Sequence, residues 1–90
     1  MTKAEFIERL AARRNVSRRE AATMVDDVLG VITETLERGD TITFTGFGKF
    51  SVHQRPERTG VNPRTGERVR VPAARVPKFA AGTGLRAAVK

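Results

Sequence analysis

The chain contains no cysteine, and His53 is the only histidine among its 90 residues. Without cysteine, neither a disulfide nor a thiolate metal site can form. The sequence also lacks a glycine-rich phosphate loop and a paired-carboxylate motif, so the groups of an active site are missing. Asp26 and Asp27 are adjacent on a predicted helix and therefore face different ways, which is typical of a solvated surface. We predict no enzymatic activity, cofactor, metal site or small-molecule substrate.

Long apolar runs are absent as well. No segment approaches the roughly 20 apolar residues of a membrane span, and the N-terminus MTKAEF lacks the apolar stretch of a signal peptide. We therefore expect a cytoplasmic protein without a membrane partner. A chain of 90 residues is near the lower limit for folding on one core. We expect a single domain, residues 1–90, whose core is completed in part by a second copy.

Acidic residues are scarce in the second half of the chain. Residues 1–45 carry seven basic and eight acidic side chains, whereas residues 46–90 carry ten and two. The formal net charge of +7 is therefore concentrated in the second half. A basic half of this kind is typical of a protein that binds a polyanion, and it favours nucleic acid over a membrane surface as the partner.

Two capping boxes predict the starts of two helices, one at Thr2 and one at Ser17. The first helix should end near Asn15, and the second at Gly39, a residue type suited to the position after a helix. Gly30 lies inside the second helix at a cost of about 1 kcal/mol relative to alanine. It is either a tolerated glycine or a point of close approach for another helix. The expected buried positions are Phe6, Ile7, Leu10 and Ala11 in the first helix and Ala21, Val25, Val28, Leu29, Ile32 and Leu36 in the second.

Alternating apolar residues after the helices predict a small antiparallel sheet. Ile42 and Phe44 share one face of a strand at 41–45, glycines at 46 and 48 break it, and the strand resumes at 49–52. A third strand returns to Phe79. A short closing helix is then expected to bury Leu85, Ala88 and Val89. The predicted fold is α+β: two N-terminal helices, a three-stranded antiparallel sheet extended into a long hairpin, and a short C-terminal helix.

The phenylalanines of this sheet have two interpretations. Aromatic side chains in a basic protein can be base-stacking platforms, or they can be core. Phe44 and Phe50 occupy the same strand positions as Ile42 and Val52, which favours core. Phe47, between two glycines, is expected at the core or at an interface.

The segment 55–75 is the most distinctive part of the sequence, with six arginines against two acids. It has too few apolar side chains for a core of its own. Pro63 fixes φ and Gly66 is free to take a positive φ, so the chain should reverse at 62–66. Residues 68–71 alternate with period two, as in a strand. We predict a basic β-hairpin arm over residues 53–76.

Arginines along such an arm suit a polyanion. Arginine presents a rigid fork of donors to phosphate, and Arg68 and Arg70 would form a ladder on one side of a strand. The alternative is that the charges keep an exposed hairpin soluble and prevent edge pairing, but six arginines exceed that need. Pro63 is either a turn residue or an apolar wedge between base pairs.

Three segments carry a resemblance to a known family: GFGKF at 46–50, RTGVNPRTGE at 58–67 and VPKF at 76–79. Together they strongly resemble the bacterial HU/IHF family of histone-like DNA-binding proteins, and HU most closely. The resemblance covers essentially the whole chain, and Asn62-Pro63 with Thr65-Gly66 is its most specific part. It implies an intertwined homodimer in which residues 1–39 form the helical dimerisation part and residues 40–90 the sheet, arm and last helix.

The resemblance also implies the site. Two arms would reach around double-stranded DNA in the minor groove, with a proline intercalating at each tip. The implied DNA-binding residues are Lys3, His53, Arg55, Arg58, Val61, Asn62, Pro63, Arg64, Thr65, Gly66, Arg68, Arg70, Arg75, Arg86 and Lys90. The implied dimer core comprises Val28, Leu29, Ile32, Leu36, Phe44, Phe47, Phe50 and Phe79. Val61 and His53 depart from the family, whose members often have a basic residue there.

The expected function is a sequence-tolerant architectural protein that bends and compacts DNA in the bacterial nucleoid, with a preference for bent or nicked DNA. An IHF-like, site-selective DNA bender is the nearer alternative. A structural protein that binds RNA or the ribosome is the alternative from another class. A heterodimer with a paralogue is left open by the sequence.

Overall fold

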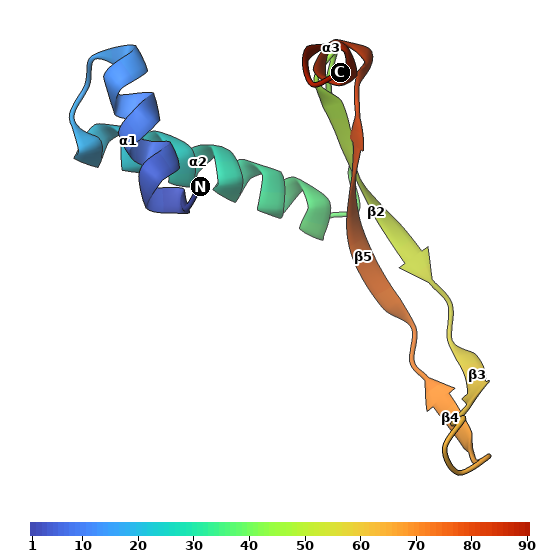
Figure 1. Cartoon of the computed structure of the whole chain (residues 1–90). Helices are drawn as coiled ribbons and strands as arrows, with labels where there is room; N and C mark the ends of the chain where they lie inside the picture. Colours follow the sequence, from blue (N-terminus) through green and yellow to red (C-terminus); the bar gives the residue numbers. More distant parts are fainter. The chain divides into compact units, whose positions relative to one another are not determined.

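The computed structural model describes all 90 residues and divides them into two compact units, Met1–Thr35 and Leu36–Lys90. In chain order the elements are α1 (Lys3–Arg14), α2 (Arg18–Glu37), β1 (Ile42–Phe44), β2 (Gly48–Arg55), β3 (Arg58–Val61), β4 (Arg68–Val71), β5 (Ala74–Ala81) and α3 (Thr83–Ala88) (Figure 1). The helices fall short of the combination of length and apolarity that crossing a membrane requires. The predicted α+β class is confirmed.

The hydroxyl side chains predicted to cap the two helices make their bonds to the first turn. The Thr2 hydroxyl accepts a hydrogen bond from the Glu5 amide at 3.2 Å, and the Ser17 hydroxyl accepts one from the Glu20 amide at 3.1 Å. Each bond satisfies a backbone donor that the first turn of a helix leaves without a partner. Helix α1 ends at Arg14 and is followed by the cap residue Asn15, whose φ of 54° is left-handed.

The chain buries very little of itself. Its only buried apolar residues are Ala11, Ala21 and Val25. The burial predicted for Phe6, Val28, Leu29, Ala88 and Val89 is wrong for a single chain, because all five residues are exposed, Phe6 at 52% and Val89 at 76%. Each helix has an apolar stripe at the expected spacing, but two small helices cannot cover both stripes.

The three-stranded sheet has the order β1-β2-β5, with β2 antiparallel to both neighbours. Phe50 lies opposite Ile42 on one side and Phe79 on the other. Its ring centroid lies 4.8 Å from that of Phe79 and 6.2 Å from that of Phe44. The three rings pack on one another on one face of the sheet. Phe44 and Phe79 are nevertheless each 44% exposed, so these predicted core positions are not buried within a single chain.

The turn between β1 and β2 lies against the start of α3. Gly46 takes a φ of +84°, its carbonyl accepts from the Leu85 amide at 3.0 Å, and the Phe47 carbonyl accepts from the Gly82 amide at 2.7 Å. An ideal Cβ on Gly82 would come within 2.8 Å of backbone atoms of Gly46. A glycine is therefore required where α3 begins.

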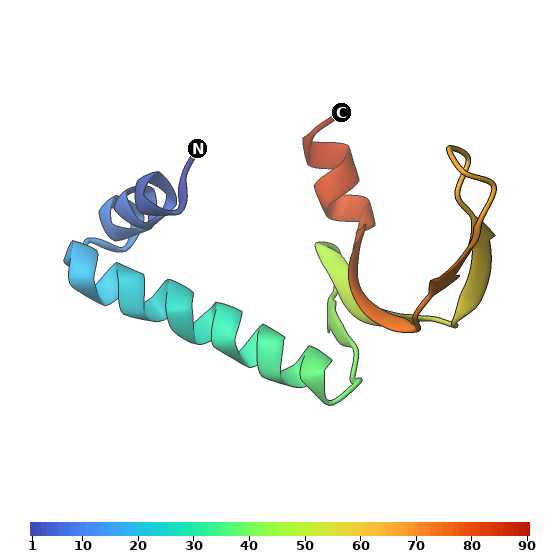
Figure 2. The same ribbon diagram turned by 90° about the horizontal axis from the view of Figure 1, so that it is seen from below.

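The arm differs from the predicted continuous hairpin. The pairing of β2 with β5 stops at Arg55, and a separate two-stranded sheet, β3 with β4, begins at Arg58. Pro56 and Pro72 lie in the interruption, where their missing amides cannot continue a ladder. The outer sheet follows the inner one along a curved arm (Figure 2).

Candidate nucleic-acid interface

The tip of the arm is a closed turn. The Asn62 amide donates to the Glu67 carbonyl and the Asn62 carbonyl accepts from the Gly66 amide, both at 2.8 Å. The Asn62 side-chain Oδ1 accepts from the Arg64 amide at 2.9 Å, which is an Asx turn. Gly66 has a φ of +74°, as predicted for the reversal. Pro63 is thus held at the end of the arm by bonds on both sides of it.

The other tip residues point into solvent. The Thr65 hydroxyl accepts from the Glu67 amide at 3.3 Å, and Val61 is 65% exposed. Val61 gives the tip an apolar surface beside Pro63.

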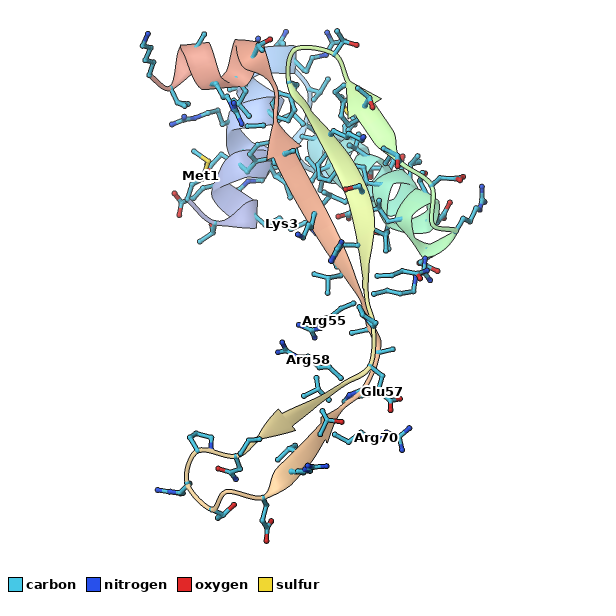
Figure 3. All side chains as sticks on the ribbon, turned by 90° about the vertical axis from the view of Figure 1, so that its right-hand side faces the viewer. Met1, Lys3, Arg55, Glu57, Arg58 and Arg70 are labelled. Carbon is cyan, nitrogen blue, oxygen red and sulfur yellow. The ribbon has the colours of Figure 1, made fainter.

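The arginines of the outer sheet lie on two faces. Arg70 pairs with Thr59 and Arg68 with Val61, whereas Arg58 pairs with Val71. Because strand side chains alternate, Arg68 and Arg70 share one face, as predicted, and Arg58 belongs to the other. Arg55 and Arg58 extend to one side of the arm, while Glu57 and Arg70 meet on the other side (Figure 3).

Arg70 is engaged within the chain. Its Nε donates to Glu57 Oε1 at 2.6 Å and its Nη2 to Glu57 Oε2 at 3.0 Å. This bidentate bond raises the pKa of the Arg70 guanidinium above its ordinary value. One edge of the guanidinium fork is therefore filled by a carboxylate.

Arg75 has a role that sequence reasoning missed. Its Nη2 donates to the carbonyls of Leu36 and Glu37 at 3.2 and 3.1 Å, at the C-terminal end of α2. That end has carbonyls without helical partners and a negative dipole, and α2 has no basic residue in its own last turn. The arginine comes from nearly 40 residues further along the chain, so no local pattern could have indicated it.

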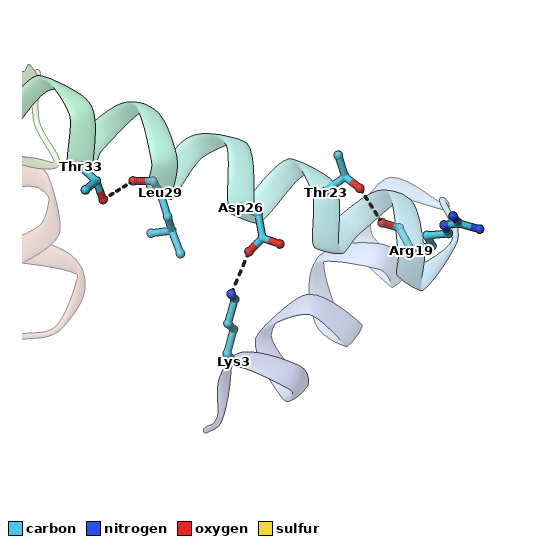
Figure 4. A network of polar contacts seen from close by, with 6 residues as sticks. All are labelled: Lys3, Arg19, Thr23, Asp26, Leu29 and Thr33. Atoms are coloured by element: carbon cyan, nitrogen blue, oxygen red, sulfur yellow. Dashed lines mark hydrogen bonds and ion pairs between the residues drawn. The ribbon is translucent and has the colours of Figure 1, made fainter.

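The other predicted contacts are surface cations or polar groups. In the first unit, Lys3 Nζ lies 2.8 Å from Asp26 Oδ1 (Figure 4). Elsewhere along α2, the hydroxyls of Thr23 and Thr33 donate to the carbonyls of Arg19 and Leu29. In the second unit, side chains that make no hydrogen bond or ion pair within the chain belong to His53, Arg55, Arg58, Arg64, Arg68, Arg86 and Lys90. The structure thus brings most of the predicted arginines together on one arm with their donors available to a ligand.

Comparison with known proteins agrees with this arrangement. The family model for "Bacterial DNA-binding protein" matches residues 1–90. The DNA-binding protein HU of Xylella fastidiosa is 47% identical over 90 residues, which are 100% of this chain and 96% of that protein. HU-alpha of Aeromonas hydrophila is 40% identical over 90 residues, with both chains fully covered.

Solved structures show the same likeness. An Anabaena HU–DNA cocrystal structure superimposes with a TM-score of 0.88 at 37% identity, covering 99% of this chain and 97% of that one. HU from Thermotoga maritima gives a TM-score of 0.72 at 29% identity, with full coverage of both chains. With two capped helices, a curved arm and a matching sequence from end to end, this chain belongs to the bacterial DNA-binding protein family and is of the HU type.

Proposed function

We propose that the chain is an architectural DNA-binding protein of the bacterial nucleoid that bends and compacts double-stranded DNA with little sequence preference. The observation that carries the proposal is the arm: four of its six arginines have no acceptor within the chain. Arginine forks without partners on a projecting hairpin suit the phosphate backbone of DNA. Contacts to phosphate position a protein on a duplex without reading its sequence.

Two copies would form the working unit. The residues proposed for the dimer core are half-buried or exposed in a single chain, with Val28 at 55%, Leu29 at 48% and Phe47 at 52% exposure. Apolar surface left open along a whole helix and a sheet face is what a tightly packed homodimer covers. The homodimer would present two arms, so that a duplex is held from two sides.

The two arms would enter the minor groove, with Pro63 as the wedge between base pairs. Pro63→Ala should reduce the bend, measured by fluorescence transfer between the ends of a labelled duplex, more than it reduces affinity at low salt. The reason is that a wedge acts on base stacking, whereas the arginines supply the affinity.

Pro77→Ala is the matched control, because Pro77 lies on the edge strand β5, away from the tip. It should leave the bend unchanged. Equal bending by Pro63→Ala and the parent protein would reject the wedge while leaving the phosphate contacts intact.

A gel shift tests the proposed function itself. Matched intact DNA, nicked DNA and RNA duplexes should bind in the order nicked DNA, intact DNA, RNA, since a nick lowers the cost of bending. For each phosphate neutralised, log K should fall with log salt by about 0.9. Tighter binding to the RNA duplex than to either DNA would instead identify an RNA-binding structural protein.

A further inference from the structure

The two sheets of the arm meet at a joint, residues 56–57 and 72–73, where the strand pairing is interrupted. The inner ladder ends where Arg55 pairs with Ala74, and the outer ladder begins where Arg58 pairs with Val71. No backbone hydrogen bond crosses residues 56–57 and 72–73 between them. The direction of the outer sheet therefore depends on the dihedral angles of these few residues.

One side-chain contact reaches into this joint. Glu57 directly precedes β3. Its two carboxylate oxygens accept hydrogen bonds from Nε and Nη2 of Arg70 on β4, at 2.6 and 3.0 Å. In the register, Arg70 pairs with Thr59, so the Glu57 carboxylate reaches diagonally across the strands. The bond continues the cross-strand connection one residue beyond the end of the ladder.

Glu57 and Pro56 together account for the whole interruption on the first strand. The pyrrolidine ring already fixes φ of Pro56 near −65°. The side chain of Glu57 is held by Arg70. Neither Pro56 nor Glu57 is therefore free to rotate between the two sheets. Pro72 restricts the second strand in the same way, which leaves Ala73 as the least constrained position.

We propose that Glu57 is a positioning residue. Its bidentate bond with Arg70 stiffens the joint, and it thereby sets the direction of the arm face that carries Arg55 and Arg58. This inference rests on the proposed function, because the direction matters only if the arm holds DNA. The contact is bidentate and planar, the arrangement in which an arginine and a carboxylate hold each other most specifically.

The size of the effect follows from exposure. Arg70 and Glu57 are 78% and 48% exposed, so water competes for the pair. Pairs of this kind shift an equilibrium by about two- to fivefold. That shift is too small to hold a fold together, but it is enough to change how narrowly the direction of the arm is distributed.

The absence of native cysteine allows a direct measurement on the protein without DNA. Spin labels on cysteines introduced at Lys49 and Thr65 report the distance from the inner sheet to the tip within one arm. Labelled chains are mixed with a large excess of unlabelled chains, so that each assembly carries one labelled pair. Glu57→Gln and Arg70→Gln should each broaden the distance distribution or add a second population, with a two- to fivefold change in the population ratio.

Two further variants complete the test. Glu67→Gln removes the same charge from the same arm, where the Glu67 carboxylate makes no bond, and should leave the distribution unchanged. The reversed pair, Glu57→Arg with Arg70→Glu, should restore the narrow distribution. A distribution that is as narrow in Glu57→Gln as in the parent, or as broad in the reversed pair as in the single variants, overturns the proposal.

Binding measurements separate this role from simple charge competition. If Glu57 only withheld Arg70 from phosphate, Glu57→Gln would bind duplex DNA more tightly, with a salt slope steeper by about 0.9 and an unchanged distance distribution. That combination overturns the proposal. A stiffened joint instead predicts fewer bent complexes for Glu57→Gln. Because the distances are measured without DNA, a failure of DNA binding would be distinguished from a failure of the joint.

Discussion

Replacing Arg55 and Arg58 together with glutamine should weaken binding to an intact DNA duplex on the order of ten- to a hundredfold. Both arginines extend to the same side of the arm, and neither donates to an acceptor within the chain (Figure 3). A hydrogen bond to a charged group contributes about 1.5–3 kcal/mol, and each 1.4 kcal/mol is a factor of ten in affinity. Water and neighbouring arginines would replace part of the lost phosphate contacts, so the expected loss of affinity stays within a factor of a hundred.

The salt dependence identifies the cause of that loss. The slope of log K against log salt should become shallower by about 0.9 for every phosphate contact removed. Fluorescence anisotropy at several salt concentrations measures both quantities. A variant with glutamine at Arg13 and Arg14 loses the same charge from the last turn of α1 and should change affinity far less. Equal losses in the two variants would mean that net charge, and not the arm, governs binding.

Gly82→Ala should lower the free energy of unfolding by about 2–3 kcal/mol, in the upper part of the range for overpacked sites. The new Cβ would lie 2.8 Å from both the carbonyl carbon and oxygen of Gly46 and 2.9 Å from the carbonyl carbon of Phe47. All three are backbone atoms, which cannot turn away as a side chain does. Gly82 has a φ of −82°, so the cost is steric and does not come from a left-handed backbone.

Urea denaturation at a fixed chain concentration measures this loss. The midpoint should fall while the slope of the transition stays the same, since a packing defect does not change the surface exposed on unfolding. Gly60→Ala is the matched control, because a Cβ there would meet its nearest neighbours at an ordinary 3.9 Å. If both variants unfolded at the same urea concentration, the turn at Gly46 would not be packed against the start of α3.

Local features were predictable from the sequence. Thr2 and Ser17 cap the helices, and Gly66 takes the positive φ that its turn requires, because each of these depends on residues within a few positions. Period-two alternation marked the strands at 42–44 and 68–71, and the turn residues Pro63 and Gly66 marked the tip of the arm, for the same reason. The family resemblance added the proposed DNA-binding residues, which local rules alone do not supply.

Contacts between distant residues were not predictable. Arg75 caps a helix that ends at Glu37, and Glu57 holds an arginine on the opposite strand. Both depend on three-dimensional proximity, and nothing in the neighbouring sequence distinguishes these two charged residues from the others on the arm. The interruption at Pro56 and Pro72 was readable in principle, since proline breaks a ladder. The exposure of Phe6 and Val89 could not be predicted, because the burial of a helix face depends on which other elements cover it.

The burial of only three side chains, those of Ala11, Ala21 and Val25, has a consequence for how the protein is maintained. If two copies pair as proposed, a chain with so small an interior draws most of its folding free energy from the partner that covers its open faces. Under the proposed homodimer, folding and association are then one mass-action equilibrium, and the folded fraction rises with chain concentration. Dilution alone would return this protein to a form that proteases degrade, so its abundance and its stability are set together.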